Sequence, residues 1–202
     1  MNEITNNKVK LTGMIVSEPE FSHESNGEKF YRTFLKVNRL SENADVIPLL
    51  ISGRGFDLDD IAGKRVDVVG QFRSHNHHDG EKNHLILNVF VTELYDSDRE
   101  EDANEIVLDG YVTKEPIYRE TPKGREIADI LFAVNRDYNK SDYIPCIVWG
   151  RNAVYASVLP VGTHLKLTGR IQNRNYTKRY PDGPEENRTA YEVSVSKIEE
   201  ES

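Results

Sequence analysis

The sequence has no long apolar run, a single cysteine and no excess of positive charge. No segment approaches the roughly 20 apolar residues that a membrane-spanning helix needs. The start, MNEITNNKVK, has no apolar core of a signal peptide. A lone thiol, Cys146, excludes an intrachain disulfide framework and suits a reducing compartment. We therefore expect a folded cytoplasmic protein.

The acidic residues are unevenly distributed. The net charge of −8 argues against nucleic-acid binding, because such proteins neutralise phosphates with Lys and Arg. Residues 1–103, however, hold 12 Lys and Arg against 19 Asp and Glu, whereas residues 104–202 hold 14 against 15. The excess of acid therefore belongs mainly to the first half.

Signatures of catalysis are also absent. The sequence has no phosphate-binding loop, nucleophile elbow or metal-ligand spacing. Four histidines, His75, His77, His78 and His84, crowd one predicted hairpin and allow a metal-site hypothesis. They come without cysteines or rigid spacing, so we interpret them as a polar hairpin tip. We expect no cofactor, no bound metal and no enzymatic activity.

The chain contains an internal repeat. Fourteen residues between positions 7 and 54 recur 97 positions later without a gap. In the first copy they are Asn7, Leu11, Gly13, Glu18, Pro19, Gly27, Val37, Asn38, Arg39, Asp45, Ile47, Pro48, Gly53 and Arg54. After a two-residue shift, Gly63 and Gly70 match Gly162 and Gly169. We predict one domain over 1–97, an acidic linker over 98–103 and a second domain over 104–202.

Each copy has the period of β-strands. Residues 126–136 and 163–174 alternate apolar and polar side chains, which predicts half-buried strands. One short helix is plausible in each copy, at 151–160 and at the poorer counterpart 54–63, where Asp57 or Asp59 could cap. Five short strands, with a helix between the third and fourth, predict an all-β protein of two tandem OB-fold barrels.

The alternation also predicts a binding face in the second copy. Tyr143 and Trp149 lie opposite the apolar positions of their strand, where Cys146 is expected to be a buried small residue. The fourth strand carries Lys166, Arg170 and Arg174, followed by Tyr176, and then Lys178 and Arg179. Rings and cations together suit single-stranded nucleic acid, because every base can stack and every phosphate can be neutralised. The alternative is that the rings reflect β-propensity and the cations solubility.

The second copy resembles the bacterial single-stranded DNA-binding protein family over nearly its whole length. The resemblance is carried by NEIVLDGYVTKEP, GREIADILFAVNR, DYIPCIVWG, LPVGTHLKLTGRIQNRNYT and YEVSVSKI. It implies OB folds, oligomerisation and base stacking at four places, which here hold Tyr138, Tyr143, Trp149 and Tyr176. It also implies that Asn135 and Arg136 lead into a DNA-binding loop, and that 175–188 forms a mobile hairpin that wraps DNA.

The first copy lacks these features. Its positions matching the four rings hold Ser41, Val46, Ser52 and His77, and those matching Lys166, Arg170 and Arg174 hold Asp67, Gln71 and His75. The hypothesis is that this copy is a structural or partner-binding module. Because Arg32, Phe34 and Lys36 are expected on the outer face, weak DNA contact by the first copy remains an alternative.

These observations predict a nucleoid-associated protein that binds and protects single-stranded DNA in replication, recombination and repair, mainly through its second domain. Because the resemblance implies four OB domains per assembly, we expect a homodimer. The resemblance also implies a Gly/Pro/Gln-rich tail that recruits partners, which we do not expect after KIEEES. The acidic first domain is the candidate site for replication or repair proteins. The alternative function is an OB-fold interaction or assembly module of replication or conjugation with weak nucleic-acid affinity.

Overall fold

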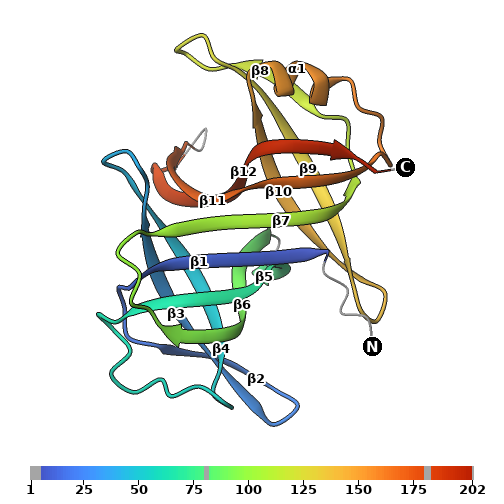
Figure 1. Ribbon diagram of the computed structural model, residues 1–202. Helices are drawn as coiled ribbons and strands as arrows, with labels where there is room; N and C mark the ends of the chain where they lie inside the picture. The colour runs from blue at the N-terminus through green and yellow to red at the C-terminus, as the bar shows by residue number, and fades with distance from the viewer. Residues whose placement is uncertain (1–5, 80–81, 180–182, 202) are drawn as a thin grey trace.

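Each repeat folds into a closed barrel of five strands (Figure 1). The computed structural model describes residues 6–79, 82–179 and 183–201, with the side chains at 78, 79, 82 and 83 excepted. The first barrel is built from β1 (Asn7–Ile15), β3 (Glu28–Asn38), β4 (Ala44–Ser52), β5 (Arg65–Asp79) and β6 (Lys82–Asp96). The second is built from β7 (Ala103–Val112), β9 (Glu126–Arg136), β10 (Lys140–Trp149), β11 (His164–Lys178) and β12 (Glu186–Glu200). The predicted fold class, two tandem barrels of the OB kind, is confirmed.

Most strand pairs are antiparallel, and one parallel pair in each barrel, β4–β6 and β10–β12, joins the third strand to the fifth. The barrels close through β1–β3 and β7–β9. At these closures a Cβ on Gly13 would lie 2.3 Å from the Lys36 carbonyl oxygen, and one on Gly110 would lie 2.2 Å from that of Ala133. The repeat therefore keeps glycine where two strands cross too closely for a side chain.

Two elements differ from the sequence prediction. The short strands β2 (Glu20–Ser25) and β8 (Ile117–Glu120) pair antiparallel with β3 and β9 at the edge of each barrel. The sequence pattern did not predict them. The expected helix forms in the second copy as α1 (Arg151–Ser157), which buries Ala153 and Ala156. No helix lies between 54 and 63 in the first copy, so that prediction was wrong.

The composition of 54–63 explains the missing helix. Asp57, Asp59 and Asp60 replace the better helix formers of α1, and Gly55 has a φ of 90°. The Asp57 carboxylate accepts a hydrogen bond from the Asp59 N–H at 3.1 Å, so it fixes a local turn and does not cap a helix. The one helix of the described residues has seven residues and is too short to cross a membrane.

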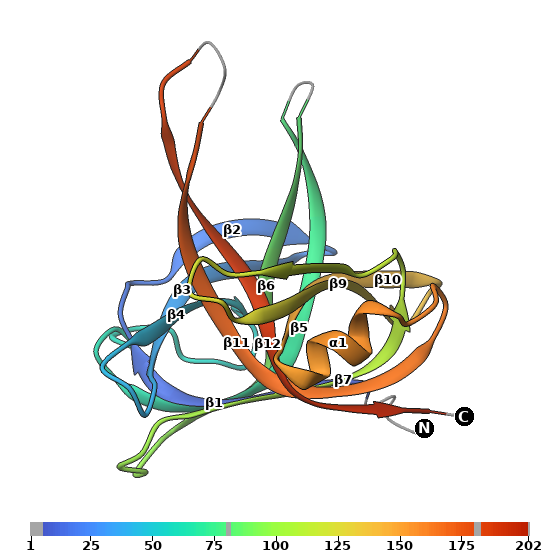
Figure 2. The same cartoon turned by 90° about the horizontal axis from the view of Figure 1, so that it is seen from above.

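The barrels join through their first strands. Asn7–Thr12 of β1 pair antiparallel with Ala103–Leu108 of β7, so a continuous sheet runs from one barrel into the other. The long hairpins β5–β6 and β11–β12 then project side by side from the same side of the molecule (Figure 2). The two barrels are therefore related as two subunits of a dimer would be.

The repeated aspartates Asp45 and Asp142 link each barrel to the other. The Asp142 carboxylate accepts a hydrogen bond from the Ser74 N–H at 2.7 Å, and the Tyr143 N–H donates to Ser74 Oγ at 2.7 Å. At the corresponding place, Asp45 accepts from the Asn173 N–H at 3.2 Å. Burial raises the pKa of Asp142, although the Ser74 N–H and Arg136 favour its charged form. These acids therefore hold the hairpin of the opposite barrel.

The predicted linker is only partly solvated. Asp98, Glu100 and Glu101 are exposed, but the Asp102 carboxylate lies 2.6 Å from Arg65 Nη1 and accepts hydrogen bonds from the backbone and side chain of Asn38. The Asp102 side chain is 7% exposed. The end of the segment is therefore fixed on the first barrel.

Replacing Asp142 with Ala is expected to lower the free energy of unfolding by about 3 kcal/mol, because it leaves the buried Ser74 N–H and the partly buried Arg136 guanidinium without their partner. Asp129→Ala removes an exposed ion pair with Arg119 and is expected to cost less than about 1 kcal/mol. Chemical denaturation of both variants tests this, and equal losses would contradict it.

Candidate nucleic-acid interface

Strand β10 presents two of the predicted rings on its outer face. Ile144, Cys146 and Val148 point into the core and are buried, as the alternation predicts. Tyr143 lies on the other face with 43% of its surface exposed. Trp149 is half-buried, and its Nε1–H donates to Ser194 Oγ on β12 at 3.0 Å. The Tyr143 ring is therefore open to solvent, whereas the Trp149 ring is tied to β12 by a hydrogen bond.

The other two rings lie on either side of β10. Tyr138, in the β9–β10 turn, has a positive φ of 62° and is 93% exposed. Tyr176 lies on the β11–β12 hairpin and is 39% exposed, with the Arg174 guanidinium carbon 5.7 Å from its ring centroid. All four predicted rings are thus wholly or partly accessible, but they come from different parts of the second barrel.

Asn135 and Arg136 lie at the contact between the barrels. The Asn135 carbonyl accepts a hydrogen bond from Asn6 Nδ2 at 2.6 Å. Arg136 Nε lies 3.2 Å from Asp142 Oδ2, and within the described part of the chain neither atom meets the geometry of a hydrogen bond. Both residues line a cavity of about 270 Å³ between the β9–β10 turn and β5. The predicted loop therefore faces the first barrel as well as solvent.

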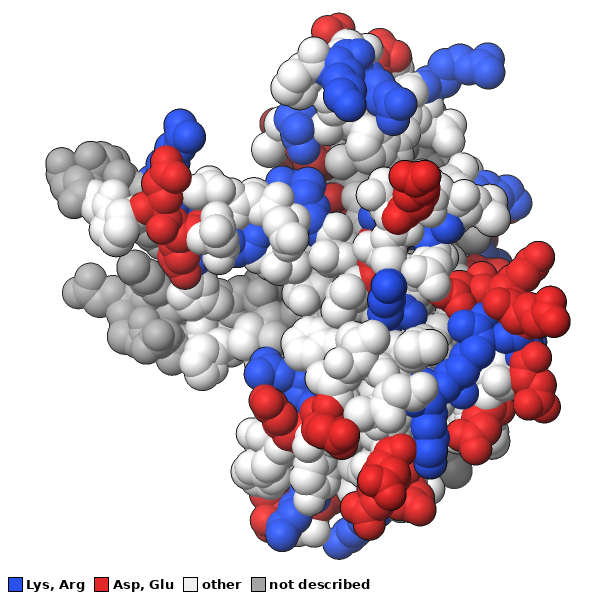
Figure 3. Space-filling model, turned by 90° about the vertical axis from the view of Figure 1, so that its left-hand side faces the viewer, with Lys and Arg blue, Asp and Glu red and all other residues white. Residues whose placement is uncertain are grey.

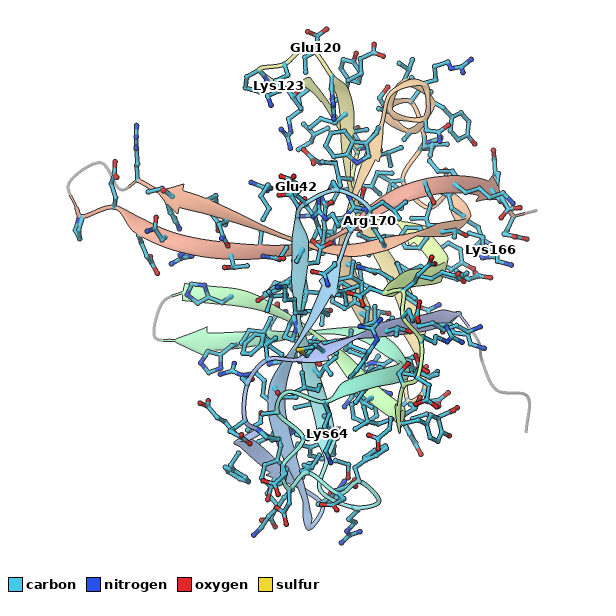
Figure 4. The ribbon with its side chains drawn as sticks, turned by 60° about the vertical axis from the view of Figure 1, so that its left-hand side comes forward. Glu42, Lys64, Glu120, Lys123, Lys166 and Arg170 are labelled. Atoms are coloured by element: carbon cyan, nitrogen blue, oxygen red, sulfur yellow. The ribbon has the colours of Figure 1, made fainter. Side chains whose placement is uncertain are left out.

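The cations predicted on β11 are spread along the strand (Figure 4). Lys166 is exposed near the stacked rings of Tyr111 and His164. Arg170 lies 3.3 Å from Asp45 of the first barrel, and burial lowers its pKa, as does nearby Arg39. Arg170 thus serves the contact between the barrels, whereas Lys166 faces solvent.

The remaining predicted cations follow the β11–β12 hairpin. Arg174 Nε lies 3.6 Å from the Glu192 carboxylate, and the exposed Arg179 lies 2.8 Å from Glu185. Lys178 is half-exposed near the end of β11. Part of the predicted wrapping arm, residues 180–182, lies outside the described residues. The described part of the hairpin combines cations with the Tyr176 ring.

The first barrel has a ring that the sequence analysis missed. Trp149 is replaced by Ser52, but Ser194, the partner of the indole, is replaced by Phe90. The Arg73 guanidinium carbon lies 3.8 Å from the Phe90 ring centroid, and Phe30 lies 6.0 Å away. His23 stacks on Phe30 at 4.9 Å. The first barrel therefore carries its ring on β6 and not on β4, and the Arg73 guanidinium covers that ring.

The outer face of β3 carries the other residues considered in the first copy. Arg32 and Lys36 are exposed, and the Arg32 guanidinium carbon lies 6.0 Å from the Phe34 ring centroid. In Figure 3, however, acidic side chains gather mainly over the lower part of the molecule, where the first barrel lies. The first barrel thus offers local cations within an acidic surface.

The histidines of the β5–β6 hairpin form no metal site among the described residues, which hold no suitable group of three His, Cys, Asp or Glu. The side chain of His78 lies outside those described. Partial burial lowers the pKa of His75, and His23, His77 and Arg136 lower it further. His75 is therefore neutral near pH 7 and adds no positive charge to the hairpin.

The geometry defines a tandem OB-fold protein with a surface of rings and cations on its second barrel. Its fold matches the wild-type single-stranded DNA binding protein from Thermus aquaticus with a TM-score of 0.78 at 20% identity, over 97% of this chain and 93% of that one. A deletion mutant of that protein matches with a TM-score of 0.74, also at 20% identity, over 97% of this chain and 94% of that one. At this identity the likeness establishes the fold alone.

The family model and the sequence relatives add to this likeness of fold. Residues 103–200 match the single-strand binding protein family. The chain is 35% identical over 106 residues to single-stranded DNA-binding protein A of Bacillus subtilis, covering 49% of this chain and 56% of that one. It is 40% identical over 80 residues to single-stranded DNA-binding protein 2 of Listeria innocua, covering 36% and 50%.

The second barrel, which residues 103–200 form, belongs to the single-strand binding protein family. The predicted resemblance is therefore confirmed. Membership of a family of binding proteins also agrees with the expectation that the chain is not an enzyme. The chain spans about half the length of the relatives that it matches.

Cys146 is expected to be unreactive in the folded protein. Burial raises the pKa of its thiol well above the usual range, so almost no thiolate forms at mildly alkaline pH. A chromogenic thiol reagent should detect one thiol per chain after denaturation and none before. Equally fast reaction in the native state would contradict the buried position.

Proposed function

We propose that the chain binds and protects single-stranded DNA, without reading its sequence, in replication, recombination and repair. The observation that carries this proposal is the set of accessible rings, Tyr138, Tyr143 and Tyr176, on a barrel that also presents Lys166 and Arg174. The names of the relatives support the same ligand. We further infer that 1–97 and 104–202 act as two domains, and that the second contributes most of the affinity.

The mechanism follows from the chemistry of these side chains. Each ring offers a face to any base, and one such stack contributes about 1–3 kcal/mol. Each Lys or Arg that neutralises a phosphate releases counterions, so affinity falls as salt rises. Neither contact depends on base identity. The hydrogen bond from the Trp149 indole N–H to Ser194 Oγ fixes the edge of that ring before DNA binds.

Oligo-dT is expected to quench the fluorescence of Trp149, the only tryptophan, with an affinity that falls as salt rises, while duplex DNA of equal length does not. Tyr143→Ala should weaken oligo-dT binding about tenfold, because it removes one stacking ring. Tyr155→Ala is the matched control, because that exposed tyrosine lies on α1, away from the proposed face.

The alternative is an interaction or assembly module of replication or conjugation with weak nucleic-acid affinity. The acidic surface of the first barrel favours it, and that barrel would then bind replication or repair proteins. If a second binding assay agrees that the chain does not bind oligo-dT, this alternative replaces the proposal.

We also propose a homodimer, because the family resemblance implies four OB domains and each chain supplies two. Light scattering of the purified protein is expected to give twice the mass of one chain. The measurement should be repeated at several salt concentrations, because added salt would weaken a dimer contact that depended on ion pairs alone. The mass of a single chain at every concentration would reject the dimer.

A further inference from the structure

The two barrels meet at two corresponding junctions. At the first junction, the β9–β10 turn of the second barrel lies against β5 of the first. At the second junction, the β3–β4 turn of the first barrel lies against β11 of the second. Figure 1 shows each turn reaching across to the other barrel. Any difference between the junctions therefore comes from residues in which the repeats diverge.

The second junction is neutralised internally. Its two arginines, Arg39 and Arg170, both lie against the buried carboxylate of Asp45. The turn adds a further acidic residue, Glu42. Gln172 donates its amide to the Glu192 carboxylate at 2.8 Å. The described residues of this junction thus offer little positive charge to a ligand.

The first junction has different residues at the corresponding positions. Tyr138 replaces Ser41, Lys140 replaces Asn43, and Arg73 occupies the place of Gln172. These three residues and Arg136 line the cavity of about 270 Å³, and the only acidic residue in its lining is Asp137. The cavity therefore draws three cations and an exposed ring from both barrels. Arg136 is paired with the buried Asp142, as Arg39 is with Asp45, whereas Arg73 and Lys140 have no counterpart at the second junction.

Arg73 is held in place before any ligand binds. Its guanidinium lies over Phe90, and Nε and Nη2 donate to Gln71 Oε1 at 3.0 and 2.8 Å. Among the described residues it forms no ion pair with a carboxylate. Burial lowers its pKa and repulsion from Arg136 lowers it further, while the nearby carboxylates of Asp142 and Asp137 offset part of this shift. An anion in the cavity would relieve this repulsion and would meet a guanidinium already oriented.

We infer that this cavity is a subsite built by both barrels, which holds one phosphodiester of single-stranded DNA. Arg73, Arg136 and Lys140 neutralise the phosphate, and the adjacent base stacks on Tyr138. The inference rests on the proposed function for its ligand. It adds that the divergent first barrel supplies a DNA-binding residue, Arg73, and that the chain has one such subsite and not two.

Arg73→Gln tests the inference, since glutamine stands at the corresponding position 172. Oligo-dT binding, followed by Trp149 fluorescence over a range of salt, is expected to weaken about tenfold. The slope of log affinity against log salt should become shallower by about 0.7, which corresponds to one lost phosphate contact. Arg54→Gln, which removes an exposed arginine outside the cavity, is the charge-matched control and should leave the slope unchanged.

A second variant guards against misfolding of Arg73→Gln. Lys140 is exposed at the start of β10, and Lys140→Gln should also make the salt slope shallower. A double-mutant cycle of Arg73→Gln with Tyr138→Ala should show that the combined loss is smaller than the product of the single losses, since both residues hold the same nucleotide.

The outcomes separate this inference from the proposed function. If the unmodified chain binds oligo-dT but Arg73→Gln and Lys140→Gln match the Arg54→Gln control, the subsite is rejected and the proposed function stands. Independent losses in the double-mutant cycle would reject a shared subsite. If the unmodified chain does not bind oligo-dT, both proposals fail.

Discussion

The antiparallel pairing of β1 with β7 determines the rest of the architecture. The pairing satisfies backbone hydrogen-bonding groups at one edge of β1 and of β7, and it fixes the two repeats in one relative orientation. Once that orientation is set, each third strand meets the hairpin of the other barrel. Asp45 and Asp142 can then accept the backbone N–H groups of Asn173 and Ser74. The hydrogen bonds between the barrels at Asp45 and Asp142 therefore follow from the pairing of β1 with β7.

The repeat keeps the residues that this arrangement requires. Asn7 and Asn104 each bond the backbone of the fourth barrel strand, at Phe72 and Ile171. The glycines at the barrel closures are kept as well, because any side chain there would collide with a carbonyl oxygen. Core positions vary but stay apolar, as Leu35 and Phe132 show, whereas the outward-facing rings and cations of the second copy are lost in the first. The two copies consequently share a scaffold while presenting different surfaces.

Much of the fold could be predicted from sequence because it is encoded locally. Alternation placed Cys146 in the core and Tyr143 outside, and the repeat predicted two barrels. The helix prediction failed at 54–63, where the aspartates of the turn outweighed the likeness to the other copy. The edge strands β2 and β8 lack a strong apolar pattern, since all their residues are exposed.

The site was less accessible to sequence reasoning because its contacts cross between strands and barrels. In the first barrel the aromatic ring lies on β6, as Phe90, and not on β4, the strand that corresponds to the position of Trp149. Only the parallel register of β4 with β6 relates the two positions. Arg170 was predicted on the DNA-binding face, but its charge lies against Asp45 of the other barrel. Arg73 becomes a candidate DNA-binding residue only because it lies beside Arg136, Tyr138 and Lys140, which are distant in the sequence. Alternation within one strand contains none of this information.

The short connection between β6, which ends at Asp96, and β7, which begins at Ala103, has a consequence for assembly. Joining two modules by a short segment gives each an effective concentration, near the other, on the order of millimolar. The barrels therefore meet as an intramolecular event, at dilutions where separate subunits would dissociate. A homodimer must also accept every substitution twice, once at each symmetric contact. Within one chain, each junction can change alone.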